Sequence, residues 1–237
     1  MLKRLPCSAL LFLSITGLSF TSAAQEIAAG INIGYATFNL GDLKEFQQEL
    51  SAQYPFDAHI VESFPGYLNF SASILFVKPT YYYGVIVGHT STAGRLSYSD
   101  YSGSFTSDQL VGINSIGTSF ALNLTKKEKT NIFLGGQTSF NFNNLVFNET
   151  IIIGDTKDTN TVSFRSVNFA LTPFIEVQQR VNNLVLRFNV GGEIQVPGDL
   201  TSQENNEVYL VNSSNEKVKF NASGLRMNIG IAYSFKK

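Results

Sequence analysis

Residues 225–235 read LRMNIGIAYSF, and every second side chain in this stretch is large and apolar. The alternating set consists of Leu225, Met227, Ile229, Ile231, Tyr233 and Phe235, with small or polar residues between its members. Side chains along a β-strand point alternately to its two faces, so a period of two predicts a strand. A strand with one bulky apolar face and one small polar face is typical of the wall of a membrane barrel.

The same alternation recurs along the chain and predicts eight strands. Their ranges are 27–39, 67–78, 81–96, 107–124, 131–146, 162–180, 184–196 and 217–235. Most carry large apolar residues at about five alternate positions, which matches the roughly 9–11 residues of a tilted strand that crosses a membrane. We therefore predict an all-β fold, an eight-stranded antiparallel up-and-down transmembrane barrel. Pro173 falls inside the sixth strand and predicts a bulge or a break in the hydrogen-bond ladder.

The connections alternate in length. Segments 78–80, 125–130 and 181–183 are tight turns, whereas long polar segments occupy 40–66, 97–106, 147–161 and 197–216. Short turns on one side and long loops on the other are the signature of outer-membrane barrels, with the short turns in the periplasm. The long segments are therefore expected to be extracellular loops.

The first long segment is expected to contain a short helix over about 42–53. Asp42 and Glu45 have the spacing of a capping box, and Leu43, Phe46 and Leu50 share one helical face. The second long segment mixes hydroxyl groups with aromatic residues, namely Tyr98, Tyr101 and Phe105. These rings either bind a sugar or a protein partner or pack on the helix.

Two eight-stranded barrels fit the alternation. A soluble lipocalin-like barrel turns its bulky apolar face inward, and a membrane barrel turns that face outward. The small face decides between them, because it is rich in glycine, serine and asparagine and poor in charge, as in Ser115–Asn123 and Gly135–Asn143. A soluble outer surface needs many charged side chains, so this face is predicted to line a crowded polar lumen.

Four ionisable residues share the phase of the small face: Glu176, Arg187, Glu193 and Arg226. They lie on neighbouring strands, and charges in so narrow an interior must be paired. We predict one charge network in the lumen, with Gln178 and Gln195 beside it. It is either a structural plug that closes the lumen or part of a gated ion path.

Four cations fall on the outward phase near the loop-side strand ends: Arg95, Arg165, Lys217 and Lys219. Arginine and lysine suit contact with the phosphates of lipopolysaccharide. The alternative is ordinary solvated charge at the rim of the barrel.

Catalysis has one candidate. His89 and Ser91 share a strand face and resemble the His-x-Ser of outer-membrane lipid A deacylases, with Asp100 or Asp108 as the acid. The alternative is an interfacial histidine beside a serine. Because the chain holds no metal-ligand cluster, glycine-rich phosphate loop or nucleophile elbow, we expect no catalytic residues, no metal and no cofactor.

The N-terminus predicts a signal peptide over residues 1–24. Lys3 and Arg4 precede an apolar stretch at 9–20, and small residues fill the positions before a cut after Ala24. A membrane anchor is the alternative, but the apolar stretch is shorter than the roughly 20 residues a spanning helix needs. The cut leaves residues 25–237 as one barrel domain with 15 basic residues, since two of the 17 are removed, against 18 acidic ones. A net charge of −3 and no cysteine, because Cys7 is removed, exclude disulfides and give no sign of nucleic-acid binding.

Residues 25–237 resemble the small eight-stranded outer-membrane proteins of Gram-negative bacteria, the OmpA-like and OmpX-like barrels. The specific features are the signal peptide, the rhythm of strands and loops, and the terminal pattern Ile229, Ile231, Tyr233 and Phe235. That pattern is similar to the signal read by the barrel-assembly machinery. The resemblance implies delivery through the periplasm to the outer membrane, with lipopolysaccharide as a neighbour. Three functions remain open: a non-enzymatic structural or surface-binding barrel, a small porin-like pore or transporter, and a lipid A-modifying enzyme.

Overall fold

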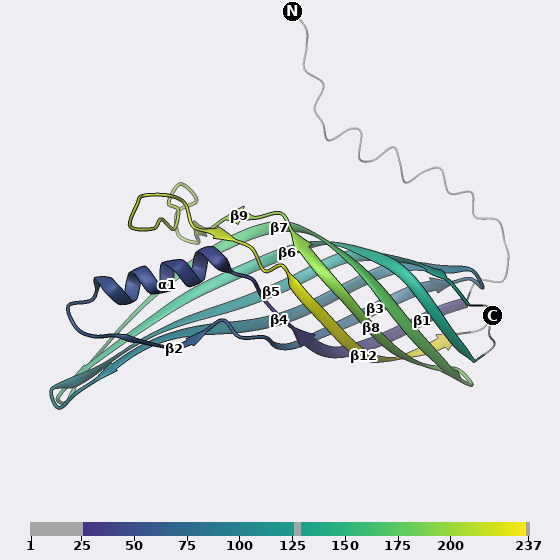
Figure 1. Cartoon of the computed structure of the whole chain (residues 1–237), viewed down its shortest axis with the longest axis horizontal. Helices are drawn as coiled ribbons and strands as arrows, with labels where there is room; N and C mark the ends of the chain where they lie inside the picture. Colours follow the sequence, from purple (N-terminus) through teal and green to yellow (C-terminus); the bar gives the residue numbers. More distant parts are fainter. Residues whose placement is uncertain (1–25, 126–128, 236–237) are drawn as a thin grey trace, which may run out of the picture.

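The computed structural model describes residues 26–125 and 129–235, so the expected signal peptide lies outside the described residues. Eight antiparallel strands form a closed ring (Figure 1), in which each strand pairs with its neighbour along the chain and β1 closes on β12. The eight are β1 (Glu26–Ala36), β3 (Tyr67–Val77), β4 (Tyr81–Ser99), β5 (Gly103–Asn123), β6 (Thr130–Ile153), β7 (Thr156–Val181), β8 (Leu184–Gln195) and β12 (Gly224–Phe235). The predicted eight-stranded up-and-down barrel is confirmed.

The stagger of the ring fixes the tilt of its strands. Paired residues followed once around the ring, from Phe169 on β7 through β6, β5, β4, β3, β1, β12 and β8, return to β7 at Gln179. From 169 to 179 is a shift of ten residues. At ~3.3 Å per residue, over eight strand spacings of ~4.8 Å, this shift gives a tilt of roughly 41°. A closed ring of eight strands at this tilt has a bore that side chains fill.

The two ends of the barrel differ. At one end, here called the turn end, β3 and β8 connect to their neighbours through Lys78–Thr80 and Asn182–Asn183, and the chain reaches Phe235. At the opposite end, here called the helix end, two connections carry further secondary structure. The expected tight turn at 125–130 falls partly on residues 126–128, which lie outside the described residues.

The expected loops at 97–106 and 147–161 are wrong. β4 and β5 turn only at Asp100–Ser102, and β6 and β7 turn only at Gly154–Asp155, so most of both segments is strand. These polar stretches are rich in threonine, serine and isoleucine, which pair well in hairpins, and polarity by itself does not end a strand. The ends of β4, β5, β6 and β7 form what we call the projecting sheet (94–99, 103–109, 147–153 and 156–163), which extends far beyond the ring in Figure 1.

The expected helix is present as α1 (Gly41–Gln53), and it lies against the projecting sheet. The predicted capping box is absent. The N-cap residue is Leu40 in a left-handed conformation, without a side-chain cap, and Asp42 instead accepts a hydrogen bond from the backbone N–H of Lys219. After the helix, β2 (His59–Ser63) pairs with β4.

No helix within the described residues is long and apolar enough to cross a membrane.

The connection between β8 and β12 contains β9 (Gly198–Asp199), β10 (Thr201–Ser202) and β11 (Lys219–Phe220). The expected last strand at 217–235 is too long, because the barrel strand starts at Gly224 and β11 pairs with β9 instead. The apolar residues change phase here: they are even-numbered from Val218 to Ala222 and odd-numbered from Leu225 onward. A phase change breaks a strand or turns its side chains to the other face.

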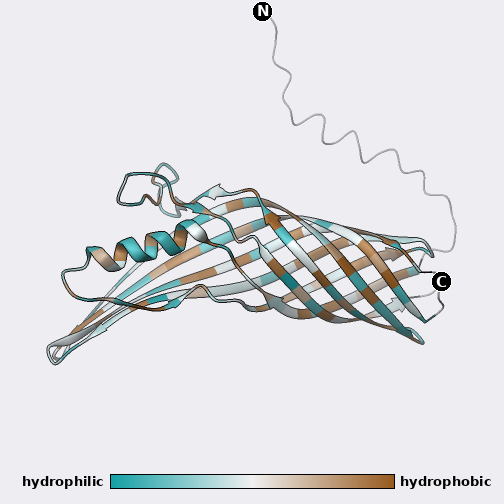
Figure 2. Cartoon of the chain, viewed as in Figure 1, coloured by the Kyte–Doolittle hydropathy of each residue, from teal (hydrophilic) through white to brown (hydrophobic). Residues whose placement is uncertain are grey.

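The bulky apolar face points outward. Ile31 and Ile229 are 64% and 61% exposed, and Figure 2 shows apolar and polar bands alternating along the strands of the ring. This orientation is the opposite of a lipocalin-like barrel. The ladder between β7 and β8 skips Thr172 and Pro173 and resumes at Phe174, so the predicted ladder break at Pro173 is confirmed.

The bore contains two apolar clusters. The turn-end cluster includes Leu75, Tyr82, Phe133, Phe174 and Val185. The helix-end cluster unites strand residues such as Ile113 and Leu145 with residues from α1 and the β8–β12 connection, such as Leu43 and Phe220. Polar side chains line the part of the bore between them.

Candidate functional site

The first buried ion pair of the bore joins β7 and β8. Arg187 donates from Nη2 to Glu176 Oε2 at 2.7 Å, and Nε donates to the same oxygen at 3.1 Å. Glu176 is 0% exposed and Arg187 is 6% exposed. At such burial each charge depends on the other, because bulk solvent scarcely reaches either one.

Neutral groups from β7 itself and from across the bore complete this pair. The Tyr82 hydroxyl on β4 and Gln178 Nε2 both donate to Glu176 Oε1, at 3.2 and 2.6 Å. Arg187 Nη1 donates to the Ser73 hydroxyl on β3 at 3.3 Å. Side chains from opposite walls of the ring therefore meet at one ion pair and close the bore at this level.

The second ion pair lies closer to the helix end. Arg226 on β12 donates from Nε to Glu193 Oε2 on β8 at 3.1 Å. Gln195 donates from Nε2 to Glu193 Oε1 at 2.7 Å and accepts a hydrogen bond from the backbone N–H of Ala222 at 3.0 Å.

Arg226 also binds backbone carbonyls. Its Nη1 donates to the carbonyl of Thr37 at 2.6 Å, and its Nη2 donates to the carbonyl of Ala222 at 2.9 Å. One guanidinium thus ties the end of β1 and the β8–β12 connection to the wall of the bore. This arrangement holds the helix-end cluster in place.

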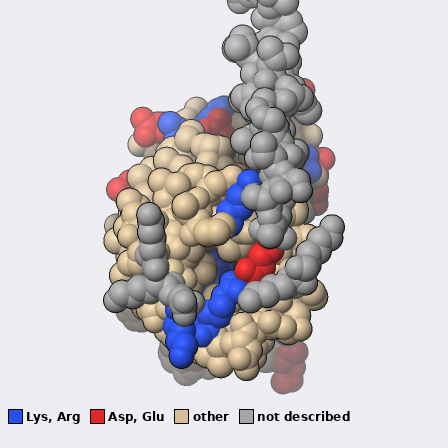
Figure 3. Space-filling model, turned by 90° about the vertical axis from the view of Figure 1, so that its right-hand side faces the viewer, with Lys and Arg blue, Asp and Glu red and all other residues tan. Residues whose placement is uncertain are grey.

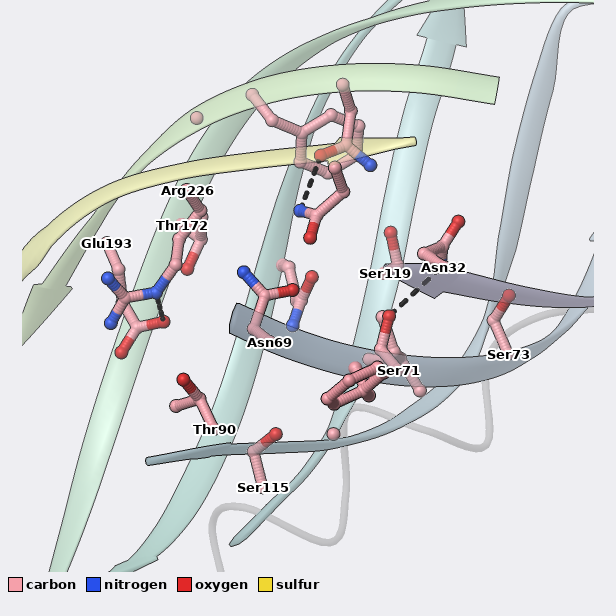
Figure 4. A pocket seen from close by; sticks show the side chains of 18 of the residues that line it. Asn32, Asn69, Ser71, Ser73, Thr90, Ser115, Ser119, Thr172, Glu193 and Arg226 are labelled. Carbon is pink, nitrogen blue, oxygen red and sulfur yellow. Dashed lines mark hydrogen bonds and ion pairs between the residues drawn. The ribbon is translucent and has the colours of Figure 1, made fainter. Parts of the chain in front are cut away.

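A polar cavity of about 90 Å³ is lined by both ion pairs, and Figure 4 shows the Arg226–Glu193 pair at its wall. Many of its wall residues are asparagine, serine or threonine, including Asn32, Ser71 and Thr90, whose side chains face the cavity. Asn32 donates to the Ser71 hydroxyl at 3.0 Å, whereas Asn69 Nδ2 is buried without a protein partner. A polar cavity of this size has room for several ordered waters.

A third ion pair crosses the mouth at the turn end. Arg180 on β7 and Glu26 on β1 approach to 2.8 Å, although β8 and β12 separate these strands around the ring. Figure 3 looks onto this end and shows basic and acidic side chains meeting within its outline. Both residues are partly exposed, so this pair is better solvated than the other two.

All four charges predicted for the lumen lie in the bore, as two separate pairs rather than one network. Asn189 lies between them: it donates to Glu176 Oε2 at 3.5 Å and accepts from Asn228 at 2.9 Å. Sequence reasoning missed Tyr82 and the Arg180–Glu26 pair. The signal was available, because Arg180 shares the phase of Glu176 and Glu26 shares the phase of Ala28.

The four cations predicted at the rim do not form one cluster. Arg95 is paired with Asp108 at 2.5 Å, and Lys217 is paired with Asp199 at 3.0 Å and lies over the Tyr209 ring. Arg165 donates to the amide oxygen of Asn206 at 2.6 Å. Lys219 lies on β11, which is not one of the eight strands of the ring. Two of the four positive charges are therefore already balanced by carboxylates.

His89 points outward from β4, and its Nδ1 lies 2.8 Å from Asn114 Oδ1 on β5. Of the two acids considered for it, Asp108 is paired with Arg95, and Asp100 accepts hydrogen bonds within its own turn. His89 therefore has an amide beside it in place of the acid that the deacylase-like arrangement requires.

Aromatic side chains connect the first long segment to the projecting sheet. The rings of Tyr54 and Phe56 pack against Phe105, and Phe56 also packs against Tyr98. The Tyr54 hydroxyl donates to Glu149 at 2.9 Å, and burial together with this carboxylate raises the pKa of Tyr54 well above its ordinary value. The aromatic residues of the second segment thus pack beside the helix, except for Tyr101.

Tyr101 is fully exposed at the tip of the β4–β5 hairpin. The turn that presents it is held by Asp100 Oδ1, which accepts hydrogen bonds from the backbone N–H groups of Ser102 and Gly103. Hydrogen bonds from the hydroxyls of Ser102 and Tyr98 lower the pKa of Asp100 to about 2.

Comparison with solved structures finds barrels of low sequence identity. Neisserial surface protein A is 12% identical over 89% of this chain and 96% of its own, with a TM-score of 0.39. Ail, the attachment invasion locus protein of Yersinia pestis, solved with the heparin analogue sucrose octasulfate, is 13% identical over 88% and 99%, with a TM-score of 0.37. The outer membrane protein OprG from Pseudomonas aeruginosa is 8% identical over 91% and 97%, with a TM-score of 0.44.

No protein-family model matches the chain, and no curated protein matches it either. At these identities and TM-scores, the likeness to the solved structures concerns the fold, and the function of this chain rests on its own residues.

Proposed function

We propose that the protein is an integral outer-membrane β-barrel with a closed bore, which acts without catalysis as a structural or surface-binding protein. The membrane location is supported by the distribution of side chains, which is the reverse of that in a soluble protein. Large apolar side chains cover the outside of the ring, whereas the buried Arg187–Glu176 pair, the partly buried Arg226–Glu193 pair and many amides lie inside it. An exposed apolar belt of this extent needs lipid around it.

Aromatic residues at the turn end support the same proposal. Tyr81 and Tyr83 stack on the outside of β4, and Tyr233 packs against Phe235 on β12. Rings gathered at one level of a barrel are typical of a membrane interface. Fractionation of cells that produce the full chain tests this: we expect the protein in the outer-membrane fraction and its extraction only by detergent. Recovery as a monodisperse protein in detergent-free buffer contradicts it.

The closed bore supports a non-conducting barrel over a pore. Along the axis an ion would meet the turn-end cluster, the Arg187–Glu176 pair, the Arg226–Glu193 pair and then the helix-end cluster. Planar-bilayer recordings of the purified protein test this, and we expect no steady conductance. A steady large conductance that persists in every preparation contradicts the plug and favours the pore.

The absence of catalysis is tested at His89. We expect the lipid A mass spectrum of cells producing His89→Ala to match that of cells producing the unchanged protein, because the neighbour of His89 is an amide. A spectrum that differs in acylation between the two strains favours the lipid A-modifying enzyme instead.

Lipopolysaccharide is the proposed neighbour of the outer rim, with Arg165 and Lys219 as its main contacts. These two are preferred because Arg95 and Lys217 already have carboxylate partners. Replacement of Arg165 and Lys219 by glutamine is expected to lower the lipopolysaccharide that co-purifies, and the same change at Arg95 and Lys217 serves as the control. Equal lipopolysaccharide in all preparations contradicts the assignment.

The barrel-assembly machinery is the proposed partner during biogenesis. The apolar face of β12 that carries Ile229, Ile231, Tyr233 and Phe235 is exposed and reaches the turn end, where Phe235 pairs with Ile27. We expect Phe235→Ser to slow assembly of the folded barrel in cells while refolding into detergent micelles in vitro stays unchanged. Equal slowing in both settings indicates a folding role instead.

A further inference from the structure

The projecting sheet has one open edge. β7 pairs with β6 from Thr156 onward, but its other edge is first occupied at Ser163, whose carbonyl accepts a hydrogen bond from the backbone N–H of Gln203. β10 then pairs with β7 at Phe164 and Arg165, and β8 pairs from Ala170 onward. Within the described residues, no strand pairs with the outer edge of 156–162, and all seven residues are exposed.

The phase of the strand identifies the unpaired backbone groups. The carbonyls of Ser163 and Phe169 both point toward the outer edge, because they accept hydrogen bonds from Gln203 and Val196. The N–H and C=O of a strand residue point to the same side, and the side alternates along the strand. Lys157, Thr159 and Thr161 therefore present three N–H groups and three C=O groups to solvent, which makes a template for another strand.

The sequence of this edge is complementary to itself in one antiparallel register. When two copies pair edge to edge, a two-fold axis relates them and one residue lies opposite its own copy. If that axis passes through position 157 or 158, Lys157 or Asp158 meets the same residue of the second copy, and like charges directly opposite each other repel. If it passes through position 160, Lys157 must pair with Ser163, whose carbonyl is already occupied. An axis at Thr159 avoids both problems, because it places Lys157 opposite Thr161 and Asp158 opposite Asn160.

We propose that the open edge of β7 binds the same edge of a second copy, antiparallel and centred on Thr159, with six backbone hydrogen bonds. The contact joins the two projecting sheets, each with β2 paired to the outer edge of β4, into one continuous sheet of ten strands. It deepens the proposed function, on which it rests, by naming a second copy of this chain as a partner of the surface.

The symmetry of this contact determines where the second copy lies. A two-fold axis that pairs identical strand edges in one sheet is perpendicular to that sheet, so it reverses the strands and the barrel axes with them. Copies in one membrane point the same way and cannot meet in this geometry. The two copies therefore belong to apposed membranes, and the contact is adhesive.

The reach of the sheet fits an adhesive contact. Thr159 lies ten residues beyond Phe169 on β7, and Phe169 belongs to the outward apolar belt. At ~3.3 Å per residue and a tilt of ~41°, this is about 25 Å beyond the level of Phe169 along the barrel axis. Six hydrogen bonds with little apolar burial make each contact weak, but many copies on two facing surfaces add avidity.

Disulfide capture tests the register in outer-membrane vesicles that carry the full-length protein with Cys7→Ser. Cα atoms of a hydrogen-bonded antiparallel pair lie about 5.5 Å apart, within the range that a disulfide spans. Thr159→Cys is expected to give covalent dimers. Thr161→Cys is the matched control, since it faces Lys157 of the partner: alone it is expected to give no dimer, and mixed with Lys157→Cys vesicles it is expected to give one. Equal dimer yield from Thr161→Cys alone and Thr159→Cys overturns the register.

Mixing of two vesicle populations with donor and acceptor lipid dyes tests the orientation. We expect clustering of vesicles with the unchanged protein and about a tenfold loss for Thr159→Pro, which removes an edge N–H without touching the β6 ladder. Thr159→Ser is expected to cluster like the unchanged protein. Membrane insertion is measured first in every sample. Failure to insert contradicts the proposed function, whereas normal insertion without clustering, or equal clustering of Thr159→Pro, overturns the adhesive contact alone.

Discussion

The closure of the bore depends on the Arg187–Glu176 pair, and Arg187→Met tests it. The substitution keeps much of the side-chain volume but leaves the carboxylate of Glu176, which is 0% exposed, without its cation. Breaking a buried pair in this way costs about 3–5 kcal/mol. Because Tyr82, Gln178 and Asn189 still donate to Glu176, we expect a loss near 3 kcal/mol in the free energy of unfolding, from the lower end of that range.

A double mutant separates the effect of the unpaired Glu176 charge from the effect of lost packing. Glu176→Gln combined with Arg187→Met strands no charge, so we expect it to be less destabilising than Arg187→Met alone, by about 2 kcal/mol. Urea unfolding in detergent micelles, followed by circular dichroism and by the gel mobility of the folded barrel, measures the difference. Arg165→Met, at an exposed arginine, is the control and is expected to change stability by less than about 0.5 kcal/mol.

A small loss in the free energy of unfolding would refute this reasoning. If Arg187→Met loses less than about 1 kcal/mol, the value of a solvent-exposed ion pair, water reaches Glu176 and the bore is open at this level. In that case only the turn-end and helix-end clusters would close the bore.

Three further predictions concern Gly230 at the contact between β12 and β1, Arg226 beside the β8–β12 connection, and Asp100 at the tip of the β4–β5 hairpin. A side chain at Gly230 would place its Cβ 2.6 Å from the backbone oxygen of Ile31, so Gly230→Val is expected to lower the yield of folded barrel on gels, whereas Gly192→Val, with open space at its Cβ, is not. Arg226→Gln releases the carbonyls of Thr37 and Ala222, and limited proteolysis of the β8–β12 connection is expected to become several times faster; an unchanged rate rules out the tethering role. The carboxylate of Asp100 has a lowered pKa of about 2, so the turn that it holds is expected to persist as the pH falls below 4 and to be lost only near pH 2. The amide chemical shifts of Ser102 and Gly103 measure this midpoint, and a midpoint near the ordinary aspartate value contradicts it.

The sequence predicted the ring because the relevant signal is local. Alternation along each strand follows from backbone geometry, and the excess of glycine and amide residues on the small face determined which face lies inside. The four lumen charges were found by the same rule. The alternation also contained Arg180 and Glu26, but these two lie just outside or at the limit of the predicted strands.

The extent of the strands was harder to predict. Segments 97–106 and 147–161 are polar, and polarity alone does not distinguish a loop from a hairpin that continues into solvent. The pairing of β5 with β6 from Gly103 to Asn123, and the packing of Phe105 against Tyr54, support strand in these segments. Both contacts join residues far apart in the chain.

The sequence by itself determined the number of strands, their phase and the side that faces outward, because side-chain alternation is a property of each strand alone. Only the tertiary structure decided which charges pair. Arg180 meets Glu26 across 154 residues, and the lumen charges divide into two pairs. The ten-residue stagger of the closed ring sets the height of each side chain along the bore, and height decides which partners lie within hydrogen-bonding distance.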